Sequence, residues 1–164
     1  RCRRNWYNIR RNAALKATLQ AQSLREWVLA EDSGLVVPAL GGEPGIFSAR
    51  FSGENASDSS NNKKLLERLS DIHGHQRAAH YSCHAALSNP DGTIVATASD
   101  MCSGIIGHTL SGSGGFGYDP LFIVPEYHQT FGELPAAVKS MISHRARAMR
   151  RMLPAILYHL EHHH

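Results

Sequence analysis

The chain has 164 residues, of which 42% are hydrophobic and 19% charged, and its formal net charge is +3. This composition is typical of one globular domain with a hydrophobic core, and it excludes a disordered or collagen-like chain. No apolar run is long enough to span a bilayer, no signal-peptide pattern is present, and three cysteines lack paired spacing, so we expect a cytoplasmic protein without membrane contact or disulfides.

Both ends of the sequence have unusual compositions. Residues 1–11, "RCRRNWYNIRR", form a basic segment with five arginines. It is interpreted either as an arm that binds nucleic-acid phosphates or as a disordered or truncated N-terminus. No recognition motif adjoins it, so the second interpretation is favoured and no nucleic-acid partner is expected. Residues 160–164, "LEHHH", resemble an expression-tag remnant, which leaves 12–159 as a single domain.

The first half of the domain alternates helical and irregular patterns. Residues 12–24 contain strong helix formers and predict a helix, and the apolar run 27–30 predicts a short buried strand. Gly, Pro and Ser predict a structured loop over 33–55. A second helix is predicted over 58–69, capped by Asp58 or Ser59, and its inner face carries Leu65, Leu66 and Leu69.

The second half begins with a predicted antiparallel hairpin. Residues 78–88 and 93–106 are its strands, and "NPDG" is its turn. The apolar residues 121–124 predict a further short strand. Ser143 is a plausible N-cap for a C-terminal helix, whose inward residues are expected to be Met149, Met152, Leu153, Ile156 and Leu157. Together these elements predict one α/β domain with a mixed sheet.

Two adjacent carboxylates follow the first predicted strand, in "LAEDSGL". Glu31 and Asp32 end an apolar run, and buried carboxylates are too costly to keep ionised without partners. A solvated turn is one interpretation. The other is a pair that holds Mg²⁺ beside substrate phosphates, or in which one carboxylate activates water.

A glycine-rich loop, "SGSGGFGYDP", is the second candidate segment. Its glycines allow a close backbone approach to a ligand, and Phe116 and Tyr118 alternate with them as a face for a nucleobase. Asp119 before Pro120 is a fixed acceptor. The loop lacks the pattern of a P-loop or a dinucleotide fingerprint, and a simple tight turn stays an alternative.

The third candidate segment, "KSMISHR", places three basic side chains near the start of the last predicted helix. Lys139, His144 and Arg145 would favour an anion there, and a solvated basic face is the alternative interpretation. Carboxylates, basic donors and an aromatic platform together fit a nucleoside triphosphate better than a sugar or a peptide.

The same residues resemble a known family, the non-canonical purine NTP pyrophosphatases, also called inosine triphosphate pyrophosphatases. The resemblance covers about residues 12–158 and rests on "AEDSGL", "ALGGEPGIFSARFSG", "GSGGFGYDPLF" and "KSMISHR" in that order. It implies an elongated, twisted mixed sheet with flanking helices that form two lobes around a cleft. It also implies a homodimer and Mg²⁺-dependent hydrolysis of ITP, dITP and XTP to the monophosphate and pyrophosphate, which cleanses the nucleotide pool.

The resemblance assigns roles to nine residues. Asp32 matches the catalytic acid that binds the metal and activates water. Donors to the 6-oxo group, expected from Arg145 and His144, would reject ATP because adenine carries an amino group there. The substrate-binding positions match Ser33, Phe116, Gly117, Tyr118, Asp119, Lys139, His144 and Arg145.

The sequence departs from this family at its beginning. Family members start with a strand and a Thr/Ser-x-Asn-x-x-Lys loop that grips the triphosphate, and residues 1–11 contain neither. A truncated gene product, a diverged inactive protein and an incomplete recorded sequence are the open explanations. The alternative function is therefore a catalytically impaired or inactive dimeric nucleotide-binding protein. A sheet edge left exposed would favour self-association.

Overall fold

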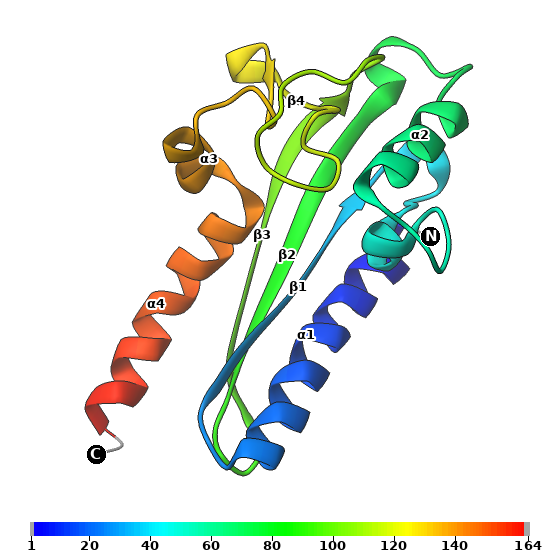
Figure 1. Cartoon of the computed structure of the whole chain (residues 1–164). Coiled ribbons are helices and arrows are strands. Elements are labelled where there is room, and N and C mark those ends of the chain that lie inside the picture. The colour runs from blue at the N-terminus through cyan, green and yellow to red at the C-terminus, as the bar shows by residue number, and fades with distance from the viewer. Residues whose placement is uncertain (1, 163–164) are drawn as a thin grey trace.

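The computed structural model describes residues 2–162, with side chains from Asn8 onward, and the last two histidines of the expected tag lie outside this range. A five-stranded sheet with the order β1-β2-β3-β4-β5 forms the centre of the fold, and every neighbouring pair of strands is antiparallel (Figure 1). The strands are β1 (Val28–Val36), β2 (Ala78–Ser88), β3 (Ile94–Ile106), β4 (Phe122–Val124) and β5 (Gln129–Thr130).

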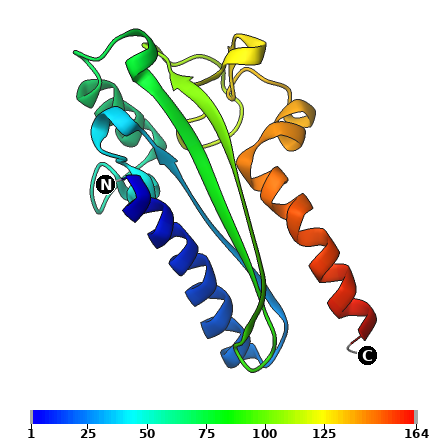
Figure 2. The same ribbon diagram turned by 180° about the vertical axis from the view of Figure 1, so that it is seen from behind.

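Helices cover both faces of this sheet. The helices are α1 (Cys2–Leu24), α2 (Asp58–Arg68), α3 (Ala136–Ile142) and α4 (His144–His162). Helix α1 packs on β1 and β2, whereas α4 packs on β2 and β3 from the other side (Figures 1 and 2). Two neighbouring residues of β2 point to opposite faces of the sheet. Ala86 packs against α1, and Ala85 packs in the cluster with Met152 of α4.

Small side chains allow α1 to lie close to the sheet. Ala13, Ala17 and Ala21 repeat at a spacing of four residues, and each is at most 1% exposed. This spacing places them on one face of the helix. The larger core cluster lies at the end of the sheet that contains β4 and the start of β2. There the rings of Phe122, Phe131 and Tyr81 pack against one another.

The α/β class and the flanking helices are confirmed. The predicted mixed sheet was wrong, because consecutive strands pair and every neighbouring pair of the described sheet is antiparallel. The predicted end of the first strand was also wrong. The strand does not stop at Ala30, because β1 continues through Glu31, Asp32 and Ser33 to Val36. Each of its nine residues has a partner on β2. Backbone pairing with this long neighbour outweighs the local preference of Asp, Ser and Gly for a loop. The two carboxylates therefore lie within a strand.

The other helix and strand boundaries differ less from the predicted ones. Helix α1 begins at Cys2 and so runs through most of the basic segment, and α2 is capped by Ser57, whose Oγ accepts from the Ser60 N–H at 3.1 Å. The predicted hairpin and the short strand at 122–124 are confirmed as β2, β3 and β4. Helix α3 falls in a stretch for which no element was predicted.

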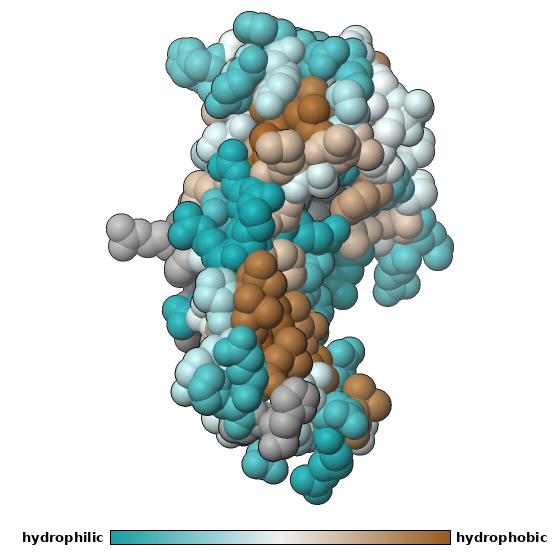
Figure 3. All heavy atoms as spheres, turned by 90° about the vertical axis from the view of Figure 1, so that its left-hand side faces the viewer, coloured by the Kyte–Doolittle hydropathy of each residue, from teal (hydrophilic) through white to brown (hydrophobic). Residues whose placement is uncertain are grey.

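The predicted inner stripe of the last helix is only partly right. Met152 is buried and Met149 and Ile156 pack beside it, but Leu153 and Leu157 are 50% and 49% exposed. Seen from the α4 side, a strip of apolar side chains runs along the lower half of the molecule (Figure 3). Leu153 and Leu157 each follow a residue of the packed face by one position, which turns them toward the flank of the helix. Within the described residues, no helix is long and apolar enough to cross a membrane.

A buried arginine joins the end of α2 to the sheet. Arg77 is 2% exposed, and its guanidinium donates hydrogen bonds at 2.7–3.0 Å to four backbone carbonyls. The acceptors are the carbonyl oxygens of Leu69, Ile72, Ile106 and Gly107. One side chain thus donates to acceptors that follow a helix and to acceptors at the end of β3.

We expect Arg77→Met to lower the free energy of unfolding by about 3 kcal/mol, because it leaves several buried acceptors without donors. Urea denaturation followed by circular dichroism measures the change. Arg11→Met, at an exposed position on α1, is the matched control and should have little effect. Equal stability of the two variants would contradict this role for Arg77.

Candidate functional site

One pocket of about 250 Å³ brings together eight of the nine predicted site residues. It lies between β1, the loop before β4, and the α3–α4 junction. Ser48, Asp58 and Tyr81 also contribute to its wall, although no role was predicted for them. The predicted residues that line it are Ser33, Phe116, Gly117, Tyr118, Asp119, Lys139, His144 and Arg145.

An aromatic ring flanked by two cations is the main feature of this pocket. The Phe116 side chain is 58% exposed, so a large apolar surface faces the pocket and solvent. The Lys139 Nζ lies 4.7 Å from the ring centroid, and the Arg145 Cζ lies 5.3 Å from it. These distances are within cation–π range, so the ring and the two positive charges form one surface.

A buried carboxylate organises this surface. Asp119 is 3% exposed, forms an ion pair with Lys139, and accepts a hydrogen bond from the Phe116 backbone N–H at 2.8 Å. Its charge is therefore compensated in the interior. Because one oxygen serves both partners, Asp119 fixes the position of the ammonium group relative to the ring.

Helix α2 clamps the next residue of the loop. Asp58 accepts from the Gly117 N–H at 2.7 Å, and the Asn62 amide donates to the Gly117 carbonyl at 2.8 Å. Gly117 has a φ of +62°, a conformation that favours glycine. Sequence reasoning missed this clamp, although the spacing of Asp58 and Asn62, one helical turn apart, is a signal that could have indicated a shared target.

His144 is held as a neutral imidazole. It is buried and stacked on Tyr81 with ring centroids 4.7 Å apart. Burial, together with the positive charges of Arg145 and Lys139, lowers the pKa of His144 to about 3. At neutral pH the ring can therefore donate from one nitrogen and accept at the other.

Several polar atoms around the pocket lack protein partners. Within the described residues, Asn62 Oδ1, His144 Nδ1 and Arg145 Nε are buried and have no hydrogen-bond partner in the chain. Such groups are costly to bury unpaired. His144 and Arg145 line the pocket, and Asn62 donates to the lining residue Gly117, so these atoms are consistent with a site for a polar ligand that offers both donors and acceptors.

Asp32 lies on the opposite face of β1 from this pocket. Its carboxylate is 2.6 Å from the Lys16 Nζ and 3.3 Å from the Asn12 amide, and both partners belong to α1. Neighbouring Glu31 points to the other face, where it pairs with Arg145 at 2.8 Å. The hypothesis that two adjacent carboxylates hold one cation is therefore wrong, because strand alternation separates them.

The fit of a Mg²⁺ ion depends on Asp32 alone. No group of three or more His, Cys, Asp or Glu side chains in the described part of the chain could hold a metal ion. Mg²⁺ is commonly bound through one or two carboxylates together with substrate phosphates, so one carboxylate is a sufficient protein contribution. Asp32 therefore fits an ion that arrives with a triphosphate, and it does not fit a preformed metal centre.

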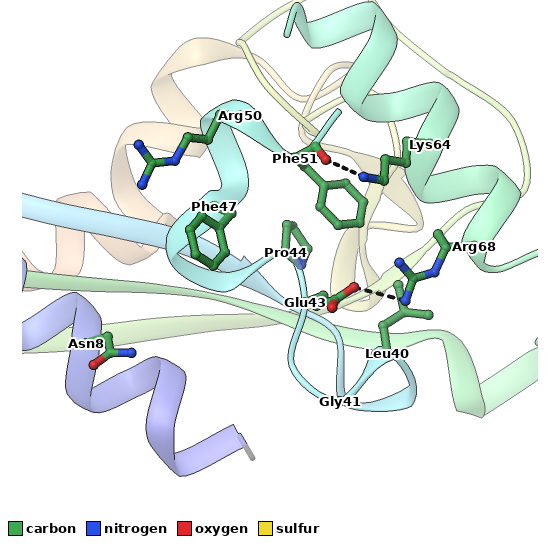
Figure 4. Close-up of a pocket in the computed structure, with 10 residues that line it drawn as sticks. All are labelled: Asn8, Leu40, Gly41, Glu43, Pro44, Phe47, Arg50, Phe51, Lys64 and Arg68. Atoms are coloured by element: carbon green, nitrogen blue, oxygen red, sulfur yellow. Dashed lines mark hydrogen bonds and ion pairs between the residues drawn. The ribbon is translucent and has the colours of Figure 1, made fainter. Parts of the chain in front are cut away.

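A second, larger pocket of about 540 Å³ contains none of the predicted site residues (Figure 4). It has basic side chains, but two of them are engaged within the protein. Lys64 donates to the Phe51 carbonyl at 2.6 Å, and Arg68 pairs with Glu43 at 2.9 Å. Among the described contacts of these basic side chains, Arg50 has no such bond, and its Cζ lies 5.3 Å from the centroid of the Phe47 ring. The smaller pocket is thus the better candidate despite its size.

Comparisons with known proteins identify a family that this chain resembles along most of its length. The sequence profile of the Ham1 family matches residues 5–155. The dITP/XTP pyrophosphatase of Rhodopirellula baltica is 53% identical over 146 residues, which cover 89% of this chain and 70% of that protein. That of Desulforamulus reducens is 49% identical over 142 residues, covering 87% and 70%.

Solved structures give the same result. A HAM1 protein from Coxiella burnetii has a TM-score of 0.85 at 34% identity, covering 92% of this chain and 77% of that one. The Staphylococcus aureus Ham1 protein has a TM-score of 0.81 at 43% identity, covering 90% and 74%. The fold, including the sheet that carries the pocket, is therefore shared with these proteins.

The depressed pKa of His144 predicts a pH dependence of stability. In the unfolded chain this group takes up a proton near its ordinary pKa of 6.5, whereas the folded protein resists protonation until about pH 3. Its contribution is present above pH 6.5 and is lost as the pH falls toward 3. We expect His144→Gln to lose less unfolding free energy than the parent between pH 6.5 and about 4.

Urea denaturation at a series of pH values measures this difference. His75→Gln, at an exposed histidine, is the control and should follow the parent curve. Parallel curves for the parent and His144→Gln would contradict a buried neutral imidazole.

Proposed function

The chain belongs to the Ham1 family, and we propose that it hydrolyses non-canonical purine nucleoside triphosphates, namely ITP, dITP and XTP, to the monophosphate and pyrophosphate. Relatives at 49–53% identity are dITP/XTP pyrophosphatases, and this proposal extends their activity to the present protein. The observation that carries it is the exposed Phe116 ring between the Lys139 and Arg145 cations. Such a surface suits a flat base that carries oxygen acceptors.

The pocket residues support selection for a 6-oxo purine. A base stacked on Phe116 would present its edge to the Arg145 guanidinium, whose buried Nε–H has no partner among the described residues. A 6-oxo group accepts from such a donor. The 6-amino group of adenine would leave the donor unpaired, and this mismatch costs binding free energy. Neutral His144 adds a donor or an acceptor without adding charge.

Asp32 is the proposed catalytic acid and metal ligand. Its carboxylate would orient a water and accept its proton as the water oxygen bonds to the α-phosphorus. The bond from that phosphorus to the bridging oxygen then breaks, and pyrophosphate leaves with the bond's electrons. Mg²⁺ bound through Asp32 would supply neutralisation of the polyphosphate charge. Lys16, at 2.6 Å from Asp32, adds a positive charge beside the same carboxylate.

A second candidate function is nucleotide binding without turnover. The observation that favours it is the position of Asp32 on the face of β1 opposite the pocket, with its charge already paired to Lys16. In that case Phe116, Lys139 and Arg145 would retain a base while Asp32 has only a structural role.

Pyrophosphate release distinguishes the two candidates. We expect Mg²⁺-dependent release from ITP, dITP and XTP, much slower release from ATP, and a loss of about 100-fold or more in Asp32→Asn, because general-base contributions are of this size. Asp91→Asn, in the hairpin turn away from the pocket, is the control. No release above that of Asp32→Asn, in a folded sample that still binds IMP, would favour the second candidate.

We also propose that the protein is a cytoplasmic homodimer. Two of its cysteines, Cys83 and Cys102, are free buried thiols, which suits a reducing compartment. The exposed leucines of α4, together with the family resemblance, support self-association. Light scattering at micromolar concentration should give about twice the monomer mass of 18.0 kDa, and the mass of a monomer would contradict this proposal.

A further inference from the structure

Arg145 is oriented by two contacts with β1, and one of them lies outside the pocket. Its Nη2 is 2.8 Å from the Glu31 carboxylate and 3.4 Å from Ser33 Oγ, and both acceptors belong to β1. Glu31 does not belong to the residues that line the pocket, whereas Ser33 and Arg145 do. The Glu31 carboxylate therefore binds the guanidinium from β1, outside the pocket, while the guanidinium lies over the Phe116 ring.

The second oxygen of Glu31 also has a partner. Cys83 is fully buried on β2, and its thiol donates to Glu31 Oε2 at 3.4 Å. Burial and the neighbouring Glu31 carboxylate raise the pKa of Cys83, so the thiol stays protonated and can only act as a donor to that oxygen. Both carboxylate oxygens of Glu31 thus have a bonding partner. Oε1 binds the Arg145 guanidinium, and Oε2 accepts from the Cys83 thiol.

We propose that Glu31 is a positioning residue that holds the Arg145 guanidinium in the orientation that reads the purine edge, and that Cys83 fixes Glu31 in turn. This inference rests on the proposed function and deepens it by naming what determines base selectivity. An arginine side chain has several freely rotating bonds, and nearly half of that of Arg145 is exposed. A charge-assisted bond at its end removes that freedom before the base arrives.

The kinetic consequence follows from where Glu31 acts. Its side chain contacts Arg145 and Cys83 and does not line the pocket. Only its backbone carbonyl, which a side-chain substitution keeps, accepts from the Lys16 Nζ at 3.3 Å. Loss of the carboxylate should therefore weaken base binding without removing a group that takes part in bond cleavage. Such a change raises KM and leaves kcat nearly unaltered. Misorientation of the donor should also reduce the preference for ITP over ATP, because discrimination depends on a donor that meets the 6-position.

The first test compares Glu31→Gln with a matched control, Asp100→Asn. Asp100 also accepts from an arginine of α4, Arg151, at 2.6 Å, so the control removes the charge from a similar pair whose members do not line the pocket. We expect Glu31→Gln to raise KM for ITP about tenfold, to change kcat less than twofold, and to lower the ITP/ATP preference. Asp100→Asn should leave all three values unchanged.

Cys83 provides a graded test of the same network. Cys83→Ser keeps a donor toward Glu31 and should behave like the parent, whereas Cys83→Ala removes the donor and should shift KM part of the way toward that of Glu31→Gln. A KM for Cys83→Ala equal to that of the parent would remove Cys83 from the proposal.

A readout without substrate separates this inference from the proposed function. Nitrogen-15 NMR detects the guanidinium Nη–H protons of Arg145, the group that binds Glu31, and they are assigned by their disappearance in Arg145→Lys. We expect a slowly exchanging signal in the parent and in Asp100→Asn, and a weakened, rapidly exchanging one in Glu31→Gln. An unchanged signal, or a Glu31→Gln enzyme with parental KM and selectivity, would overturn the inference. A parent that hydrolyses no ITP would overturn only the proposed function.

Discussion

The alternation of side chains along β1 is the constraint on which the organisation of the site depends. Consecutive residues of an extended strand point to opposite faces, so Glu31 and Ser33 face α4 while Asp32 faces α1. The register with β2 is continuous along the whole strand, and a slip by one residue would exchange the two faces. The position of each carboxylate is therefore determined by backbone pairing as much as by its own ion pair.

Charge compensation explains how so many ionic groups coexist around a small pocket. Asp119 balances Lys139, Glu31 balances Arg145, and His144 stays neutral between the two cations. Each cation keeps one side toward the Phe116 ring. The arrangement leaves the pocket with donors in defined positions and without an uncompensated buried charge, which would be costly. An incoming ligand then gains directional bonds and does not need to organise the side chains itself.

Sequence reasoning found the pocket residues more reliably than it found the strand that organises them. The glycine-rich loop and the basic cluster are contiguous in sequence, so composition alone indicated Phe116, Lys139 and Arg145. The path of β1 depends on pairing with β2, some fifty residues away, and local propensity at Asp32 to Gly34 indicated a loop instead. The clamp on Gly117 was missed for the same reason, because its partners lie on α2. The exposure of Leu153 and Leu157 depends on which part of the apolar helix face meets the sheet, and helical periodicity does not encode this.

The opposite orientations of Asp32 and Arg145 restrict how one substrate could engage both. Within the described sheet, β1 is an edge strand, because the order of strands begins with it and β2 occupies its other side. A ligand cannot pass through a hydrogen-bonded sheet. Within the described residues, a nucleotide whose base lies on the α4 face would have to pass around an edge of the sheet to reach Asp32. An extended triphosphate is long and flexible enough for such a path, whereas a compact ligand is not. The separation of the two faces thus favours a substrate with a flat base at one end and a polyphosphate chain at the other.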